Sequence, residues 1–416
     1  MLIPIERTLF QLHLAGAVWS SPHRKAFEEA ALADADLSRL FVDESESGGW
    51  TSMVYRSTGS GGGLQLWSLP ELLLTNAWWL GRLNDDCGRD ALGGTLVSLL
   101  NLLRRATHGE PCEVKALVAF TGIVLDGVDE IELPFGVLRS VRDHERELAP
   151  SSLEGQVSHT YGEGDSVTAS YAGDMVLETT VEYRLKVEPP KVDGLSAWPT
   201  DLRSYERLEA NLDSIRLASL LVGDAEAMLT LAPTWRMVLD PLSWGPLQSW
   251  RDPRTGPSIA PRRMTATAAE ELAAWTKAVH THRRSSFYIA IRRTISASAS
   301  RVDQVDALVD LVIAWENLFG SGQGESTLRV SAALGWLLGS TAEQREEIRA
   351  KAAKVYGLRS DVVHGNRVVP PEEAAEALLV ARRLTLSGLR VLFRERADVL
   401  ALGKSGERSR VLLMGG

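Results

Sequence analysis

The chain has 416 residues, 44% of them hydrophobic and 24% charged, a composition typical of globular proteins with two or three domains. Two cysteines, Cys87 and Cys112, are too few for a disulfide framework or a thiolate zinc site, and no apolar run approaches the length of a membrane span. The net charge of −9 argues against a protein that coats nucleic acid through bulk electrostatics. We therefore expect a cytoplasmic protein that does not enter a membrane.

The first part of the chain is expected to be an α+β domain. The glycine run at 59–63 predicts a loop or hairpin tip, and residues 90–109 have the apolar spacing of a helix that ends at Gly109. Between about 112 and 187 apolar and polar residues alternate around Gly-Asp and Asp-Gly turns, which predicts a mostly antiparallel sheet. To residues 1–195 we assign a sensory or regulatory role.

Two Pro-containing stretches divide the middle of the chain. Residues 188–200 predict a domain boundary, after which a helix is expected to start near residue 201 and run to Gly223. Residues 250–264, rich in Pro and Gly, predict a second separation. We therefore expect residues 196–264 to form a helical connector.

Every segment beyond residue 264 has a helical period, so residues 265–416 are expected to form an all-α bundle. Gly365 predicts the end of one helix, and Pro370 and Pro371 followed by two glutamates predict the start of the next. The expected helices cover approximately 266–281, 285–299, 302–319, 325–339, 342–364 and 371–397. The predicted fold class is α+β, with a β-rich N-terminal region followed by this helical domain.

Charge is distributed unevenly between the two parts. Residues 1–250 hold 20 Lys and Arg against 36 Asp and Glu, a balance of −16, whereas residues 251–416 hold 25 against 18, a balance of +7. Arginine accounts for 37 of the 45 basic residues. Its planar guanidinium suits bidentate phosphate contacts, although Arg-rich composition is also common in high-GC bacterial sequences.

Several common catalytic motifs are absent from the sequence. It contains no phosphate-binding P-loop, HExxH, CxxC pair or GxSxG elbow, which argues against ATPase, zinc-dependent and elbow-type hydrolase functions. His280 and His282 are two residues apart, a spacing that does not place both on one helical face, so we expect a solvated pair and no metal site. We expect no cofactor.

One pattern does suggest chemistry. An Arg followed by four to six residues and a His occurs at Arg7 and His13, at Arg139 and His144, and at Arg359 and His364. About one or two such matches are expected by chance. Arg139 and His144 fall where the strand pattern ends, and the first pair lies near the terminus. The third pair closes a long predicted helix in the basic part of the chain, so we select it.

The segment YGLRSDVVHG, residues 356–365, resembles the Tyr-x-x-Arg-Ser-x-x-Val-His-Gly run that closes a helix in the Apea-like branch of the HEPN family. Residues 306–320 resemble the helix of that family that carries a Glu before a Leu-Phe pair, here Glu316, and residues 326–339 resemble the helix that follows. The resemblance covers about 266–397. We recognise no named domain in the first 200 residues.

The resemblance implies a metal-independent endoribonuclease with Arg359 and His364 as the catalytic pair. A histidine titrates near neutrality and can move the proton of the RNA 2′-hydroxyl, while an arginine supplies fixed positive charge for the phosphorane. The products should carry 2′,3′-cyclic phosphates, and DNA should not be cleaved. Ser360 and Asp361 are expected to orient the pair, and Glu316 is expected to hold Arg359 through a bidentate salt bridge.

Helix geometry adds a constraint on this site. Residues five apart are about 140° from one another on an ideal helix, so Arg359 and His364 do not share a face. The resemblance implies that two copies meet in a homodimer with a composite active site. We expect the dimer to form through the helices around 302–319 and 342–364.

The biological role is inferred from the family alone: a bacterial stress or anti-phage defence effector whose acidic first part senses a trigger or restrains the basic second part. The trigger, which could come from a phage, and any regulatory partner are unknown. One alternative is an inactive HEPN module that binds RNA or nucleotides. Another is a toxin controlled by a partner nucleotidyltransferase, which is disfavoured because Asn366 stands where that subfamily carries a modifiable Tyr. Tyr356 and three tryptophans, Trp275, Trp315 and Trp336, are expected in the core.

Overall fold

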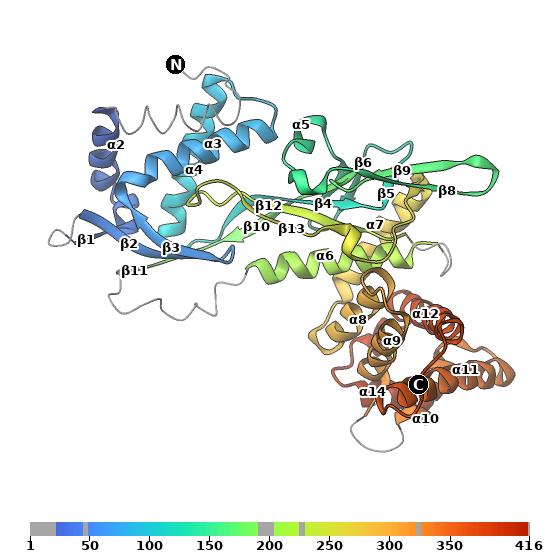
Figure 1. Cartoon of the computed structure of the whole chain (residues 1–416). Coiled ribbons are helices and arrows are strands. Elements are labelled where there is room, and N and C mark those ends of the chain that lie inside the picture. The colour runs from blue at the N-terminus through green and yellow to red at the C-terminus, as the bar shows by residue number, and fades with distance from the viewer. Residues whose placement is uncertain (1–21, 45–48, 190–203, 224–228, 322–325, 415–416) are drawn as a thin grey trace.

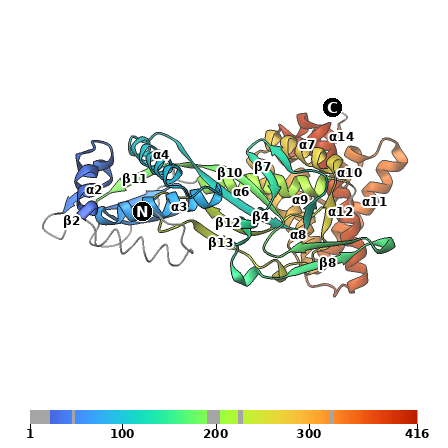
Figure 2. The same cartoon turned by 90° about the horizontal axis from the view of Figure 1, so that it is seen from above.

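The computed structural model describes residues 22–44, 49–189, 204–223, 229–321 and 326–414. A β-rich N-terminal region is followed by a helical bundle, so the predicted α+β fold class is confirmed (Figure 1). The molecule is elongated in Figure 2, with the N-terminal helices and small sheet at one end and the bundle at the other. The predicted Arg7 and His13 pair lies outside the described residues.

A small sheet forms the N-terminal end, and strand β2 lies at its centre. Its strands are β1 (Val42–Glu44), β2 (Gly49–Arg56), β3 (Ser60–Gln65) and β11 (Leu185–Glu188). β2 pairs antiparallel with each of the other three. The turn between β2 and β3 needs only residues 57–59, with Gly59 at φ +93°. Most of the glycine run that predicted a loop therefore lies in β3, because backbone pairing does not require side chains.

The central sheet has six antiparallel strands in the order β13-β12-β4-β10-β7-β6, which confirms the predicted antiparallel character. Its strands are β4 (Cys112–Thr121), β6 (Glu130–Leu133), β7 (Gly136–Ser140), β10 (Met175–Tyr183), β12 (Ala232–Val238) and β13 (Leu247–Trp250). The other strands of this region are β5 (Ile123–Leu125) and the hairpin β8 (Gln156–Thr160) and β9 (Ser166–Ser170).

Helices cover both faces of the central sheet. The helices of this region are α2 (Pro22–Ala33), which packs against α3 at the N-terminal end, α3 (Leu69–Leu83), α4 (Arg89–Thr107), the short α5 (Asp143–Arg146) and α6 (Ser204–Leu221). In Figure 1, α3 and α4 lie on one side of the sheet and α6 lies on the other. Leu117 and Ala119 of β4 pack in a core with Trp79 of α3, whereas Val118 and Phe120 belong to the core that α6 shares. Successive side chains of β4 thus point to opposite faces of the sheet, and both faces are buried.

The prediction of a helical connector is wrong for residues 232–264, which contain the strands β12, β13 and β14 (Arg262–Met264). Helix α6 and Gly223 at φ +69° agree with the predicted helix. However, β12 inserts beside β4, and β14 pairs parallel with β5, so the sheet is not complete within residues 1–195. β12 is short and begins with an Ala-Pro pair, and much of it is buried, so it lacks the alternation that marks a half-exposed strand.

The helical domain agrees closely with the prediction, and its described residues from 265 onward contain no strand. Its helices are α7 (Ala266–His282), α8 (Tyr288–Ala299), α9 (Gln304–Phe319), α10 (Ser326–Leu338), α11 (Ala342–Val363), α12 (Pro371–Arg394), α13 (Ala397–Leu400) and α14 (Ser405–Leu413). The last two were not predicted. Helix α9 is central: it contacts α8, α10, α11, α12 and α14, and Leu311, Trp315 and Phe319 are fully buried.

Candidate active site

Helix α11 carries the Arg359 and His364 pair and has a defined beginning and end. Thr341 and Gln344 form a capping box at its first turn. At the other end His364 is the C-cap, Gly365 adopts φ +67°, and the amides of Gly365 and Asn366 donate to the carbonyls of Val362 and Asp361. This Schellman arrangement confirms that Gly365 ends the helix, and it fixes the backbone that carries His364.

Glu316 of α9 meets two residues of α11. The hydroxyl of Tyr356 donates a hydrogen bond to Oε1 of Glu316, and Nη2 of Arg359 lies 3.5 Å from Oε2. The guanidinium of Arg359 lies 5.9 Å from the centre of the Tyr356 ring. The expected contact between Glu316 and Arg359 therefore exists, but it is a single long ion pair and not a bidentate one. Tyr356 occupies the carboxylate oxygen that a second contact would need.

Tyr356 has a second role that the sequence alone did not indicate. It is buried, as expected for a core residue, but burial and the carboxylate of Glu316 raise the pKa of its hydroxyl to about 12. It therefore remains a hydrogen-bond donor at neutral pH. Tyr356 precedes Arg359 by three residues, so both lie on the face of α11 that meets α9. That spacing was the available signal for a joint contact with Glu316.

The side chain of Arg359 is 20% exposed, and its Nε is buried without a hydrogen-bond partner among the described residues. A buried donor without a partner costs free energy, typically about 1–3 kcal/mol. The exposed part of the Arg359 side chain therefore places a positive charge at the surface, whereas its Nε lies in the interior.

His364 is exposed, and no side-chain hydrogen bond or ion pair of His364 occurs within the described part of the chain. The structure brings Glu316, Tyr356 and Arg359 together but does not add His364 to that group, in agreement with the five-residue offset. The imidazole is therefore accessible to a ligand or to a second molecule.

Ser360 and Asp361 do not orient the pair in the expected way. Among the described residues, neither side chain bonds to Arg359 or His364; instead their backbone carbonyls accept from the amides of His364 and Asn366. The side chain of Asp361 lines a cavity of about 490 Å³ between α11 and α12, together with Lys354 and other residues. Both positions are on the last turn, where the backbone bonds that end the helix are made.

The structure also explains why Arg139 is not a candidate. Its side chain is 7% exposed, and it donates to Glu145 at 2.7 and 2.8 Å and to Glu178 at 2.8 Å. Two carboxylates neutralise this guanidinium inside the β region, so it is not available to a phosphate. His144 follows in α5 and has a half-buried side chain.

Two further expectations concern histidine and tryptophan residues. His280 is not a freely solvated residue: its ring packs 5.3 Å from that of Phe135, and burial and Arg283 lower its pKa. The described residues contain no group of three or more metal-ligating side chains. Trp275 and Trp315 are buried as expected, but Trp336 is 41% exposed, with the Arg345 guanidinium 3.8 Å from its ring centre. A cation–π contact thus replaces the core packing expected of Trp336.

The surface next to the motif bears on the expected dimer. Because α9 is surrounded by other helices of the same chain, most of its surface is not available to a second copy. Val363 and Val368, on either side of the His364 turn, are 51% and 94% exposed. Of the expected dimer surface, α11 is therefore the accessible part, at its C-terminal end and along residues 342–351, most of which are exposed.

Comparisons with protein-family models, with curated proteins and with solved structures find no match for this chain. Among the described residues, no helix has the length and apolar character needed to cross a membrane.

Proposed function

We propose that the C-terminal helical domain is a metal-independent endoribonuclease of the HEPN type. The proposal rests on the resemblance of residues 356–365 to the HEPN motif and on the chemistry of the site. Its main support is the placement of Arg359 and His364: one is a charge held at the surface by Glu316, and the other is an exposed imidazole at the end of the same helix.

In the proposed reaction, His364 removes the proton from the 2′-hydroxyl, and the resulting oxygen attacks the adjacent phosphorus. The bond from phosphorus to the 5′-oxygen breaks, and this oxygen takes a proton from an imidazolium. Arg359 stabilises the negative charge that develops on the phosphoryl oxygens through the exposed part of its guanidinium group. The products are a 2′,3′-cyclic phosphate and a free 5′-hydroxyl.

The composite site in a homodimer is part of the proposal. A second copy that packs against the His364 turn, over Val363 and Val368, supplies the group that one chain cannot place beside its own Arg359. Helix α9 then has a supporting role, because it holds Glu316 from within the bundle.

The physiological role we propose is that of a stress or anti-phage effector that acts on RNA in the cytoplasm, with the N-terminal region as its regulator. Helix α6 contacts α7, α8 and α12, so a signal in the β region has a direct route to the bundle. An inactive module that binds RNA or nucleotides is the second candidate, favoured by the long and single contact between Arg359 and Glu316.

The test is incubation of the full chain with end-labelled RNA and, separately, DNA in the presence of EDTA. We expect RNA cleavage with 2′,3′-cyclic phosphate ends and no DNA cleavage. Binding of RNA without cleavage would favour the inactive module, and cleavage that requires Mg²⁺ would contradict the metal-free mechanism.

A further inference from the structure

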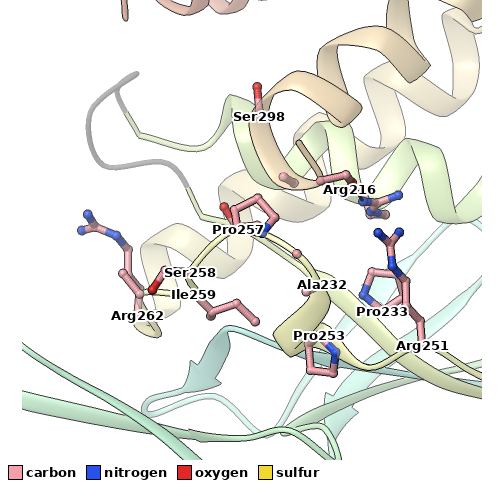
Figure 3. Close-up of a pocket in the computed structure, with 15 residues that line it drawn as sticks. Arg216, Ala232, Pro233, Arg251, Pro253, Pro257, Ser258, Ile259, Arg262 and Ser298 are labelled. Carbon is pink, nitrogen blue, oxygen red and sulfur yellow. Dashed lines mark hydrogen bonds between the residues drawn. The ribbon is translucent and has the colours of Figure 1, made fainter. Parts of the chain in front are cut away.

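A second site lies at the junction of the β region and the helical bundle, away from Arg359 and His364. It is a cavity of about 210 Å³ enclosed by α6, the start of β12, the loop after β13 and the end of α8. Figure 3 shows its wall, in which Arg216 of α6 and Arg251 of the loop direct their guanidinium groups toward one another. Two cations from segments far apart in the sequence thus converge on one small space.

No Asp or Glu lines the cavity among the described residues. Asp213, one turn before Arg216, does not line the cavity: its carboxylate lies 4.0 Å from Nε of Arg292 and accepts a hydrogen bond from Tyr288, although its charge also acts on Arg216. Burial is the main cause that lowers the pKa of Arg216; the carboxylate of Asp213 opposes this shift, and the charge of Arg251 adds to it. Like charges held together in a partly desolvated site are stabilised by an anion.

A buried donor in the wall also lacks a partner. Among the described residues, Nε of Arg216 is buried without a hydrogen-bond partner, and its Nη2 makes one long contact of 3.3 Å with Oγ of Ser300. A ligand with several acceptor oxygens would satisfy such donors, because buried polar groups are nearly always hydrogen-bonded.

The remaining wall defines the shape of the ligand. Pro233, Pro257 and Ile259 supply apolar surface next to the two arginines. Arg262 does not join the pair, because its guanidinium lies 5.1 Å from the ring centre of Tyr161 and points away from the cavity in Figure 3. The site therefore combines two convergent guanidinium groups with an apolar wall, in a volume suited to a small molecule and not to a polymer.

We infer that this cavity binds a small ligand with a phosphate group, held by Arg216 and Arg251. A phosphate offers the oxygens and charge that paired guanidinium groups recognise. Because the wall comes from both the sheet and α8, the bound ligand connects the β region to the bundle. The inference is independent of the proposed nuclease activity.

Calorimetric titration of the full chain with inorganic phosphate, and separately with adenosine 5′-monophosphate, tests the site at constant ionic strength. We expect binding of at least one of the two. Tighter binding of the nucleotide would identify an organic phosphate as the ligand, and equal binding would identify the phosphate group alone. Arg251→Gln should weaken binding at least tenfold and should leave the fold intact, because Arg251 is exposed.

Two control variants isolate the site. Arg254→Gln changes an arginine of the same loop that pairs with Asp252 outside the cavity, and it should bind as the unmodified chain does. His364→Ala should also bind normally, which separates this cavity from the proposed nuclease site. Absence of binding by both probes, or binding that Arg251→Gln leaves unchanged, would overturn the inference.

Discussion

Glu316 on α9 accepts a hydrogen bond from the hydroxyl of Tyr356 on α11, and the same carboxylate is the only described ion-pair partner of Arg359. One carboxylate therefore serves both a packing contact and the charge of the proposed site. These two functions can be separated by substitution.

Glu316→Gln keeps an acceptor for Tyr356 but removes the charge beside Arg359. We expect an unfolding free energy within about 1 kcal/mol of the original and a loss of RNA cleavage of about tenfold, because Arg359 is less well positioned. Tyr356→Phe is the matched variant: it should cost about 1 kcal/mol in stability and change cleavage less. Chemical denaturation and initial cleavage rates measure both quantities. Equal effects of the two variants on cleavage would show that the charge of Glu316 has no special role.

Arg408 of α14 is fully buried and stabilises the end of α9. Its guanidinium donates to the carbonyls of Asn317, Leu318 and Leu402 at 2.7–2.8 Å. Arg408→Met should lower the unfolding free energy by about 3 kcal/mol, because three carbonyl groups lose their donors next to Glu316. The exposed Arg410 on the same helix is the control, and Arg410→Met should change stability by less than about 0.5 kcal/mol. Equal stabilities of the two variants in a denaturant titration would contradict this reading.

Asp174 links the stability of the central sheet to pH. Burial is the main cause that raises its pKa to about 6, although the amide of Ser170 and the hydroxyl of Thr121 donate to its carboxylate. Because the folded state holds this proton more tightly than the unfolded chain does, the contribution of Asp174 to stability is lost as pH rises from about 4 to 6.

Asp174→Asn should remove this loss. Between pH 4 and pH 7 the stability of the variant should rise relative to the original chain by about 1–3 kcal/mol. Denaturation midpoints across this range measure the difference, and Asp143→Asn, at a fully exposed position, is the control. A constant difference between Asp174→Asn and the original chain at all pH values would refute the assignment.

The composite site predicts complementation between inactive chains. Arg359→Ala and His364→Ala chains should each be inactive alone, and mixing them should restore part of the activity, because one of the two clefts in the heterodimer can combine intact groups. Sedimentation should show a dimer at the concentrations that cleave RNA. An unrestored mixture of demonstrably exchanged subunits, or a fully active monomer, would contradict the shared cleft.

Much of the helical domain could be predicted because its helices are long, periodic and bounded by residues such as Gly365 and Pro371. The short β12 could not, because its seven residues become a strand only through pairing with β4. The contact between Glu316 and Arg359 was expected from the resemblance. That it is a single ion pair could not be predicted, because Tyr356 donates to the other carboxylate oxygen of Glu316, and helical periodicity does not encode such contacts between helices. The proximity of Arg216 and Arg251 could not be predicted either, because the two residues share a cavity wall only once α6 has packed against the sheet.

The most direct test of the central claim is the initial rate of RNA cleavage in EDTA by the original chain, His364→Ala, Arg359→Ala and His144→Ala, each shown to be folded. We predict loss of at least a hundredfold for His364→Ala and Arg359→Ala, in line with the contribution of general acid–base and electrostatic groups. His144→Ala, which alters the competing Arg and His match, should retain the original rate. Cleavage by His364→Ala and Arg359→Ala at the rate of the original chain would contradict the assignment of this site.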